Sequence, residues 1–381
     1  MKNFYFILLI IFCANNVFAQ NTEENQLKTT VIGRLHFDGA AYFKDVTPLS
    51  NGATFNDVRL GATARYGKWS GKVEIGFANS KIGIKDVFAE YTINDNSYIK
   101  AGHFPEIFGL DVMEGSSNIK FLTPNATNQA FAPSRRLGVK YVYRTDLLWA
   151  GIGAFGDKDI NNSVKGNDGY AFTGRVVARP YTEEGKIFHL GVAGSFRKAD
   201  ANGLNEDGTE KERVASFASN AETTVESTKF INAEIANAKN QIKGAVELIG
   251  AYGAFHFQGE YMYNEVTRTE SLEKYHAQGV YGQIGFLAIG GKYSYSKGVA
   301  RLAMPKARSL EFVARYNVTD LNNSNSGIYG GKMNDISIAA NYYINKYVVL
   351  RLNYVNVNLD EHSLNGKENF NLIQGRIQFT F

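Results

Sequence analysis

The chain has 381 residues, one cysteine and a formal net charge of +4 at pH 7. The small net charge argues against a nucleic-acid partner, and the single cysteine excludes a disulfide framework and a thiolate metal site. Aromatic residues make up 13% of the chain, with 38 Gly and only 6 Pro, a composition that fits a transmembrane β-barrel better than an ordinary soluble protein.

The first element in chain order is an export segment. Lys2 supplies a positive charge, residues 4–12 are wholly apolar, and residues 17–19 end in a small Ala. This order is typical of a cleavable signal peptide rather than a buried helix, and the apolar core is too short to span a bilayer permanently. We therefore predict a signal peptide over residues 1–19 and a single barrel domain over residues 20–381.

The mature chain contains no further apolar run near the 18 residues that a membrane helix requires. Instead, about sixteen segments alternate apolar and polar residues with a period of two, which predicts strands with one apolar face. The clearest segments are residues 30–43, 57–66, 72–78, 86–93, 135–144, 171–179, 188–197, 243–251, 254–266, 277–288, 310–319, 335–344, 348–357 and 371–381. Less regular segments lie at residues 98–103 and 147–155.

The connections between these segments alternate between long polar loops and very short turns. Residues 105–133 and 199–240 are long connections, whereas residues 67–68 and 95–96 form tight turns. Outer-membrane barrels show this asymmetry because their periplasmic rim carries tight turns and their outer rim carries loops. One periplasmic connection, residues 289–307, is longer than this rule predicts. The expected fold is all-β: a transmembrane 16-stranded antiparallel β-barrel with both termini in the periplasm of a Gram-negative bacterium.

The C-terminal segment separates this fold from a soluble β-sandwich or jelly roll. Alternate residues up to Phe381 are apolar and lie on one face. This ending is similar to the signature that the barrel assembly machinery recognises, so we expect that machinery to be a partner through Phe381. The outer-membrane lipid is the second expected partner.

The lipid face fixes which side chains point into the barrel, because an Arg or Lys facing lipid costs about 2–4 kcal/mol at the midplane. The inward set predicted to line a pore and bind anions is Arg34, Arg59, Arg65, Arg136, Lys140, Arg175, Arg179 and Arg315. Acidic side chains point inward as well, and they include Glu74, Asp86, Glu247, Glu260 and Glu311. Two interpretations stay open and can hold at different depths: paired charges that stiffen the wall, or an excess of Arg that attracts phosphate or carboxylate groups.

The third long loop is the most informative connection. It has nearly thirty residues and no predicted structure of its own, which usually indicates a functional or a disordered segment. In a 16-stranded barrel we expect it to fold into the lumen and narrow it. Its end, residues 131–136, then brings Arg135 and Arg136 close to the constriction, and Arg135 is the ninth residue predicted to line the pore and bind anions.

The same region resembles a known family, the phosphate-selective porins O and P. Residues 102–109 are similar to the family's G-x-F-x-E-x-F-G pattern, and residues 133–139 to its Pro-x-Arg-Arg-x-Gly-Val pattern. Further matches follow in order at residues 174–176, 188–191 and 311–316, so that the likeness covers nearly all of the mature chain. The resemblance implies a barrel that is usually a homotrimer, with basic residues that select anions such as phosphate or pyrophosphate.

We therefore predict an outer-membrane porin for passive diffusion of small hydrophilic solutes, with an anion bias. The alternatives are a non-selective porin, or a surface binding or structural barrel that makes contacts through residues 199–240. An enzyme is not expected, because the six histidines are scattered along the chain and form neither a nucleophile–base pair nor a metal-binding spacing. No cofactor or metal is predicted.

Overall fold

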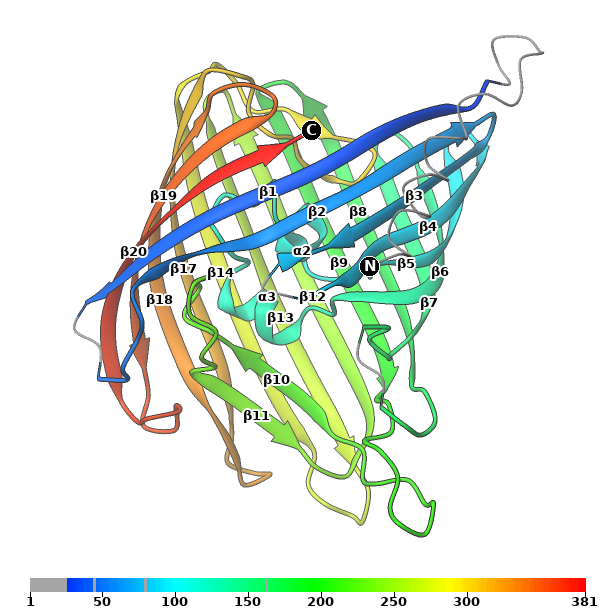
Figure 1. Ribbon diagram of the computed structural model, residues 1–381, viewed down its shortest axis with the longest axis vertical. Helices are drawn as coiled ribbons and strands as arrows, with labels where there is room; N and C mark the ends of the chain where they lie inside the picture. The colour runs from blue at the N-terminus through cyan, green and yellow to red at the C-terminus, as the bar shows by residue number, and fades with distance from the viewer. Residues whose placement is uncertain (1–25, 44–45, 79–80, 162–163) are drawn as a thin grey trace, which may run out of the picture.

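The computed structural model describes residues 26–43, 46–78, 81–161 and 164–381. Sixteen strands pair in an antiparallel manner with their neighbours in chain order, and β1 closes the ring by pairing with β20 (Figure 1). The predicted 16-stranded antiparallel barrel is confirmed, whereas the predicted signal peptide lies outside the described residues. No helix in the described part of the chain is long and apolar enough to cross a membrane.

The barrel strands are β1 (Lys28–Phe43), β2 (Gly52–Tyr66), β3 (Trp69–Gly76), β4 (Gly83–Asn94), β5 (Ser97–Pro105), β6 (Arg135–Arg144), β7 (Leu148–Gly156), β8 (Tyr170–Glu183), β9 (Lys186–Lys198), β12 (Ala238–Tyr252), β13 (Phe255–Arg268), β14 (Tyr275–Ile289), β17 (Ser309–Asn323), β18 (Ile328–Tyr343), β19 (Val348–Leu359) and β20 (Glu368–Thr380). Two small sheets do not pair with the strands of the ring: β10 (Ala215–Ser219) with β11 (Ile231–Ile235), and β15 (Tyr295–Ser296) with β16 (Arg301–Leu302). Two short helices, α2 (Leu110–Glu114) and α3 (Ala126–Phe131), belong to the third loop.

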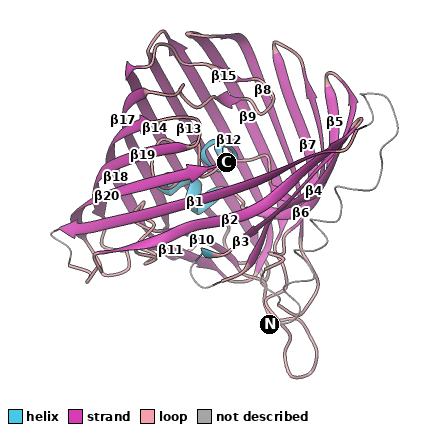
Figure 2. Cartoon of the chain, turned by 45° about the horizontal axis from the view of Figure 1, so that its top comes forward, coloured by secondary structure: helices cyan, strands magenta, loops and turns pink. Residues whose placement is uncertain are grey.

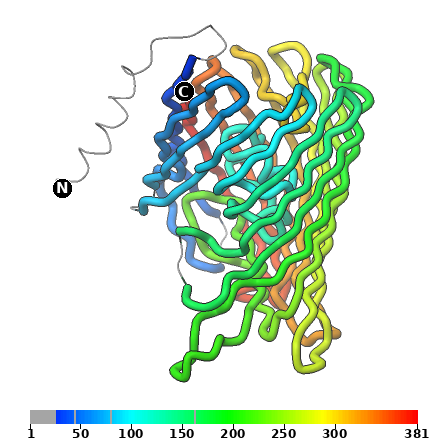
Figure 3. The backbone as a smooth tube through the Cα atoms, turned by 90° about the vertical axis from the view of Figure 1, so that its right-hand side faces the viewer, coloured from blue at the N-terminus to red at the C-terminus, as the bar shows by residue number. Residues whose placement is uncertain are grey.

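The two ends of the barrel differ as the sequence predicts. Tight turns join β2 to β3, β4 to β5 and β12 to β13 at one end, which we call the turn rim. Long connections gather at the other end, the loop rim, which is the lower end in Figure 3. In an outer-membrane barrel the turn rim faces the periplasm. The exception is the connection over residues 290–308, which carries β15 and β16.

Side chains alternate between the two faces of the wall with the predicted register. On β17, Phe312 is 46% exposed on the outer face, whereas its neighbour Glu311 is fully buried inside. On β2, Leu60 is exposed and Arg59 is buried. The charged side chains point into the lumen because exposing them to lipid is energetically unfavourable.

The third loop folds into the lumen, as predicted, and Figure 2 shows its helices within the ring of strands. Part of the long connection between β9 and β12, residues 215–235, also folds inward, whereas residues 202–213 are mostly exposed. The apolar side chains of β10 and β11 occupy alternate positions, and Phe217 and Ile231 pack in one cluster with Phe131 of the third loop and with Met262 and Leu372 of the wall. Burial of these side chains stabilises the inward position.

The long connection at the turn rim fills the lumen from the opposite end. Tyr293 donates a hydrogen bond to Glu311 (2.8 Å), and Trp149 donates to the carbonyl of Gly298 (3.2 Å). Ala300 packs with the third loop and the wall in one apolar cluster. The third loop, residues 215–235 and residues 290–308 therefore fill the side of the lumen bounded by β8 to β20.

Candidate functional site

Among the described residues, the inward-facing charges of β1 to β6 are more exposed to water than those of the opposite wall. The side chains of Arg175 and Arg315, on β8 and β17, are at most 1% exposed. By contrast, the side chains of Lys72 and Arg135, on β3 and β6, are 18% and 28% exposed. What we call the basic lane consists of inward charges of β1 to β6. Those exposed to water are Arg34, Arg65, Lys72, Lys100, Arg135, Arg136, Lys140 and Arg144, with the acids Asp86 and Glu90, and the buried Arg59, Asp57 and Glu74 connect some of them by ion pairs.

A continuous series of ion pairs crosses the lane nearer the loop rim. Its members in order are Arg34, Asp57, Arg59, Glu74, Lys72, Asp86 and Arg135, with successive N–O distances of 3.2, 2.5, 3.0, 3.1, 2.9 and 2.6 Å. We call this series the charge chain. Each carboxylate lies between two cations, so that four positive groups share three negative ones and most of the positive charge is neutralised locally. The strand register explains the arrangement: Arg34 and Arg59 lie directly opposite each other, and Asp57 offsets their repulsion.

Two serines of the third loop, Ser116 and Ser117, connect it to the charge chain and to the neighbouring wall. Arg34 donates to the hydroxyl of Ser116 (2.7 Å), and that hydroxyl donates to Asp57 (3.0 Å). Arg351 and Gln378 hold the adjacent backbone by donating to the carbonyl of Ser117 at 2.8 and 3.1 Å. The loop is therefore tied to the adjacent strands β19, β20, β1 and β2, and bounds the lane from within.

Inside the lumen, a buried cluster fixes the third loop to residues 215–235. Arg315 forms ion pairs with Asp111 of α2 (3.4 Å) and with Glu222. Asp111 also accepts hydrogen bonds from Asn125, the residue that caps α3. Burial, together with the nearby Asp111, raises the pKa of Glu114 to about 7. The filled side of the lumen is thus held by charge pairs as well as by apolar packing.

Nearer the turn rim, positive charge exceeds negative charge. Lys100 and Lys140 lie directly opposite each other on β5 and β6, and Glu90 lies opposite Lys100 on its other side. Glu90 pairs with Lys100 at 3.0 Å. Within the described residues, no carboxylate lies at ion-pair distance from Arg65, Lys140 or Arg144. We call Arg65, Lys100, Lys140 and Arg144 the turn-rim cluster.

Aromatic rings support three of these cations. The Nζ atom of Lys100 lies 3.7 Å from the centroid of the Phe88 ring, and that of Lys140 lies 5.1 Å from Phe104. The guanidinium of Arg144 lies 5.8 Å from the Tyr98 ring. A ring face attracts a cation without carrying a net negative charge. The rings hold the three cations in position, and Lys140 and Arg144 have no carboxylate partner among the described residues. The cluster lies beside a cavity of about 500 Å³ that Arg65, Lys100 and Glu90 help to line.

Six of the nine predicted site residues belong to the basic lane. Arg34, Arg59 and Arg135 lie in the charge chain, and Arg65 and Lys140 lie in the turn-rim cluster. The sixth, Arg136, lies near the loop rim, where it approaches Asp157 at 3.9 Å and donates to Ser134 (2.6 Å).

Arg175, Arg179 and Arg315 point inward as expected, but the inserted segments cover them. Arg175 pairs with Glu247 (2.6 Å) and donates to the carbonyl of Ala300 (3.0 Å). Arg179 donates to the backbone carbonyl of Lys297, in the lumen filling, and to that of Thr145, in the turn between β6 and β7. Their guanidinium groups hold the lumen filling in place, because residues 290–308 lie between β8 and the open side.

Three lane residues were absent from the predicted set. Lys72, Lys100 and Arg144 occupy the same inward register as the predicted cations. The alternation of apolar and polar residues in β3 and in residues 135–144 indicates that Lys72 and Arg144 point inward. Lys100 belongs to β5, whose weak alternation in residues 98–103 hid its orientation.

The comparisons with known proteins agree with this geometry. The family model described as phosphate-selective porin O and P matches residues 30–381. Among solved structures, OmpT, an outer membrane protein of Vibrio cholerae, superposes with a TM-score of 0.61 at 11% identity over 95% of this chain and 99% of that chain. The anion-selective porin from Comamonas acidovorans gives a TM-score of 0.60 at 13% identity, covering 93% of this chain and 100% of that one. OprB of Pseudomonas putida gives 0.53 at 9% identity, covering 94% and 95%. A search of curated protein sequences found no match.

Proposed function

The chain belongs to the phosphate-selective porin O and P family and is an outer-membrane porin, and we propose that it conducts small hydrophilic anions along the β1 to β6 side of its lumen. The filling of the opposite side supports this route. The third loop and residues 215–235 pack there in one apolar cluster with the wall, and residues 290–308 close the same side from the turn rim.

The observation that carries the anion bias is the direct opposition of Lys100 and Lys140. Like charges opposite each other on neighbouring strands destabilise a sheet, and the one nearby carboxylate, Glu90, pairs with Lys100 alone. An oxyanion passing between the two ammonium groups relieves this repulsion. We therefore propose the turn-rim cluster, and not Arg135 and Arg136, as the main source of anion preference.

Phosphate-sized oxyanions are the solutes that suit this cluster best. Lysine ammonium groups and an arginine fork make charge-assisted hydrogen bonds to phosphate and carboxylate oxygens. The family description names phosphate, and the Comamonas porin is described as anion-selective. We propose inorganic phosphate and pyrophosphate first, and small carboxylates second.

The charge chain favours a second candidate, a porin without ion preference. Its four cations and three carboxylates lie where the third loop contacts the lane, so this part of the lane is close to neutral. The reversal potential in a planar bilayer under a KCl gradient decides between the two functions. If the porin prefers anions, the reversal potential is displaced from zero toward the chloride equilibrium potential. A reversal potential at zero, or one displaced toward the potassium equilibrium potential, contradicts the anion preference.

Assembly and export are proposed by the same reasoning. The Vibrio OmpT structure is described as a trimer form, and we propose a homotrimer for this porin. We further propose that residues 1–19 are removed during export and that Phe381 contributes to recognition by the barrel assembly machinery. The protein acts as a channel in this account, without catalysis. The mass of the purified native assembly and its N-terminal sequence test the trimer and the cleavage site.

A further inference from the structure

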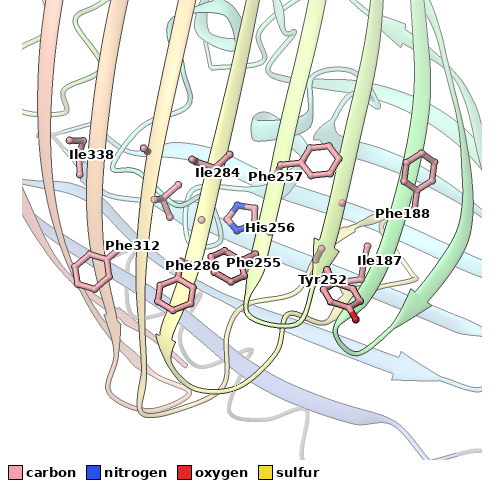
Figure 4. A pocket seen from close by; sticks show the side chains of 15 residues that line it. Ile187, Phe188, Tyr252, Phe255, His256, Phe257, Ile284, Phe286, Phe312 and Ile338 are labelled. Atoms are coloured by element: carbon pink, nitrogen blue, oxygen red, sulfur yellow. The ribbon is translucent and has the colours of Figure 1, made fainter.

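The lipid-facing surface of the barrel contains a hollow of about 680 Å³ close to the turn rim. Figure 4 shows that its side chains come from β9, β12, β13, β14, β17 and β18. The large apolar side chains around it are Phe188, Tyr252, Phe255, Phe286, Phe312 and Ile338. All of them are exposed on the outer face of the wall.

Small residues create the hollow. Gly250 of β12 has no side chain, and the Phe257 ring lies against its Cα, since a Cβ at this position would come within 2.1 Å of the ring. Ala314 of β17, which is exposed, leaves a gap between the larger side chains. Gly250 itself is buried beneath the Phe257 ring, so an apolar group from the membrane meets that ring and Ala314 between the larger side chains.

Two lysines lie at the water edge of this hollow. Lys186 is the register partner of Tyr252. The side chain of Lys292 packs over Gly185, where a Cβ would come within 2.7 Å of it, and the backbone of Gly253 donates to the carbonyl of Gly185 (2.8 Å). Both lysines are exposed, and within the described residues neither has a carboxylate at ion-pair distance.

We propose that this hollow and the two lysines form a binding site for an anionic phospholipid of the periplasmic leaflet. An acyl chain occupies the hollow, and the headgroup phosphate lies between Lys186 and Lys292. Aromatic side chains at the membrane interface flank the glycerol region, and the lysines provide the charge that complements an anionic headgroup. A second protein copy is a poorer occupant, because lysine is depleted in protein–protein interfaces.

Native mass spectrometry of the full porin in mild detergent tests the proposal, with phosphatidylglycerol as the probe and phosphatidylcholine of the same chain length as the comparison. We expect one phosphatidylglycerol per protomer at low lipid concentration, with at least tenfold weaker binding of phosphatidylcholine. Ala314→Phe fills the hollow from the outer face, and the double variant Lys186→Gln/Lys292→Gln removes the headgroup contacts. Each should weaken phosphatidylglycerol binding at least tenfold.

Two matched variants serve as controls. Ala62→Phe adds the same ring to the outer face of β2, and Lys346→Gln removes a turn-rim lysine that, like Lys186, lies over a tyrosine ring. Neither should change lipid binding. Equal binding by all variants, or an equal loss with Lys346→Gln, overturns the proposal. A loss of assembly in Ala314→Phe without a loss of lipid also overturns it, because it assigns the hollow to a second copy. The lysine double variant leaves apolar packing intact, so it tests the site even if Ala314→Phe fails to fold.

Discussion

Replacing Lys140 by Gln is expected to lower the anion preference of the porin while leaving its conductance close to that of the original protein. Lys140 lies opposite Lys100 and contacts no carboxylate within the described residues. The substitution keeps the size of the side chain and removes one positive charge from the lane. It also removes the repulsion between the two lysines, so it should not destabilise the barrel.

The magnitude follows from Coulomb's law. A unit charge about 4 Å from a passing ion contributes about 1 kcal/mol in water, which is about a fivefold change in occupancy. Loss of the Lys140 charge raises the free energy of a passing chloride ion and lowers that of a passing potassium ion by similar amounts. The permeability ratio of chloride to potassium should therefore fall by about 5-fold to about 25-fold.

The assay is the reversal potential in a planar bilayer at low ionic strength, because the screening length is about 10 Å at 0.1 M salt and shortens above it. Lys140→Arg preserves the charge and should preserve selectivity. Lys332→Gln removes an exposed charge near the loop rim, outside the lane, and should have little effect. An unchanged permeability ratio in Lys140→Gln refutes the assignment of anion preference to the turn-rim cluster.

Two further predictions concern the segments inside the lumen. Arg315→Met leaves Asp111 and Glu222 buried without their cation, so the free energy of unfolding in urea should fall by about 3–5 kcal/mol. The control Lys332→Gln should change this free energy by less than about 1 kcal/mol. Equal effects of the two variants would contradict a stabilising role of the buried ion pairs. Burial and Asp111 raise the pKa of Glu114 to about 7, so the folded barrel holds this proton more tightly than the unfolded chain does, and the free energy of unfolding should fall as pH rises from about 4.5 to about 7. Glu114→Gln should flatten this pH dependence and stabilise the barrel at pH 8 relative to the original protein, and an unaltered pH profile would show that Glu114 does not titrate in this range.

The wall of the barrel could be predicted from the sequence, because its physical rule is local. Each strand must present an apolar face to lipid, so that the alternation around Phe312 also oriented Glu311 and Arg315. The third loop was assigned to the lumen from its length and its lack of regular structure. Strand β5 is the exception, since Gly102 and the buried ring of Phe104 weaken the alternation that would have revealed Lys100.

The filling of the lumen could not be predicted, because it depends on contacts between segments far apart in the chain. Ile231 of β11 packs in one cluster with Phe131 of the third loop, and no local pattern shows that these residues meet. Two signals were nevertheless present: the unusual length of residues 289–307, and the alternation of apolar residues at 231–235. This filling is why Arg175, Arg179 and Arg315, correctly oriented inward, are not open to the lane.

The central claim, that solutes pass along the β1 to β6 side, is tested most directly by cysteine accessibility. In a chain whose single cysteine, Cys13, is replaced by Ala, Thr63→Cys introduces a thiol beside the turn-rim cavity, and Ser195→Cys introduces one beneath the lumen filling, where the side chain is buried. The measurement is single-channel current before and after addition of an anionic methanethiosulfonate reagent. We predict that the current of Thr63→Cys falls while that of Ser195→Cys does not change. Block of the Ser195→Cys channel with no effect on Thr63→Cys would contradict it.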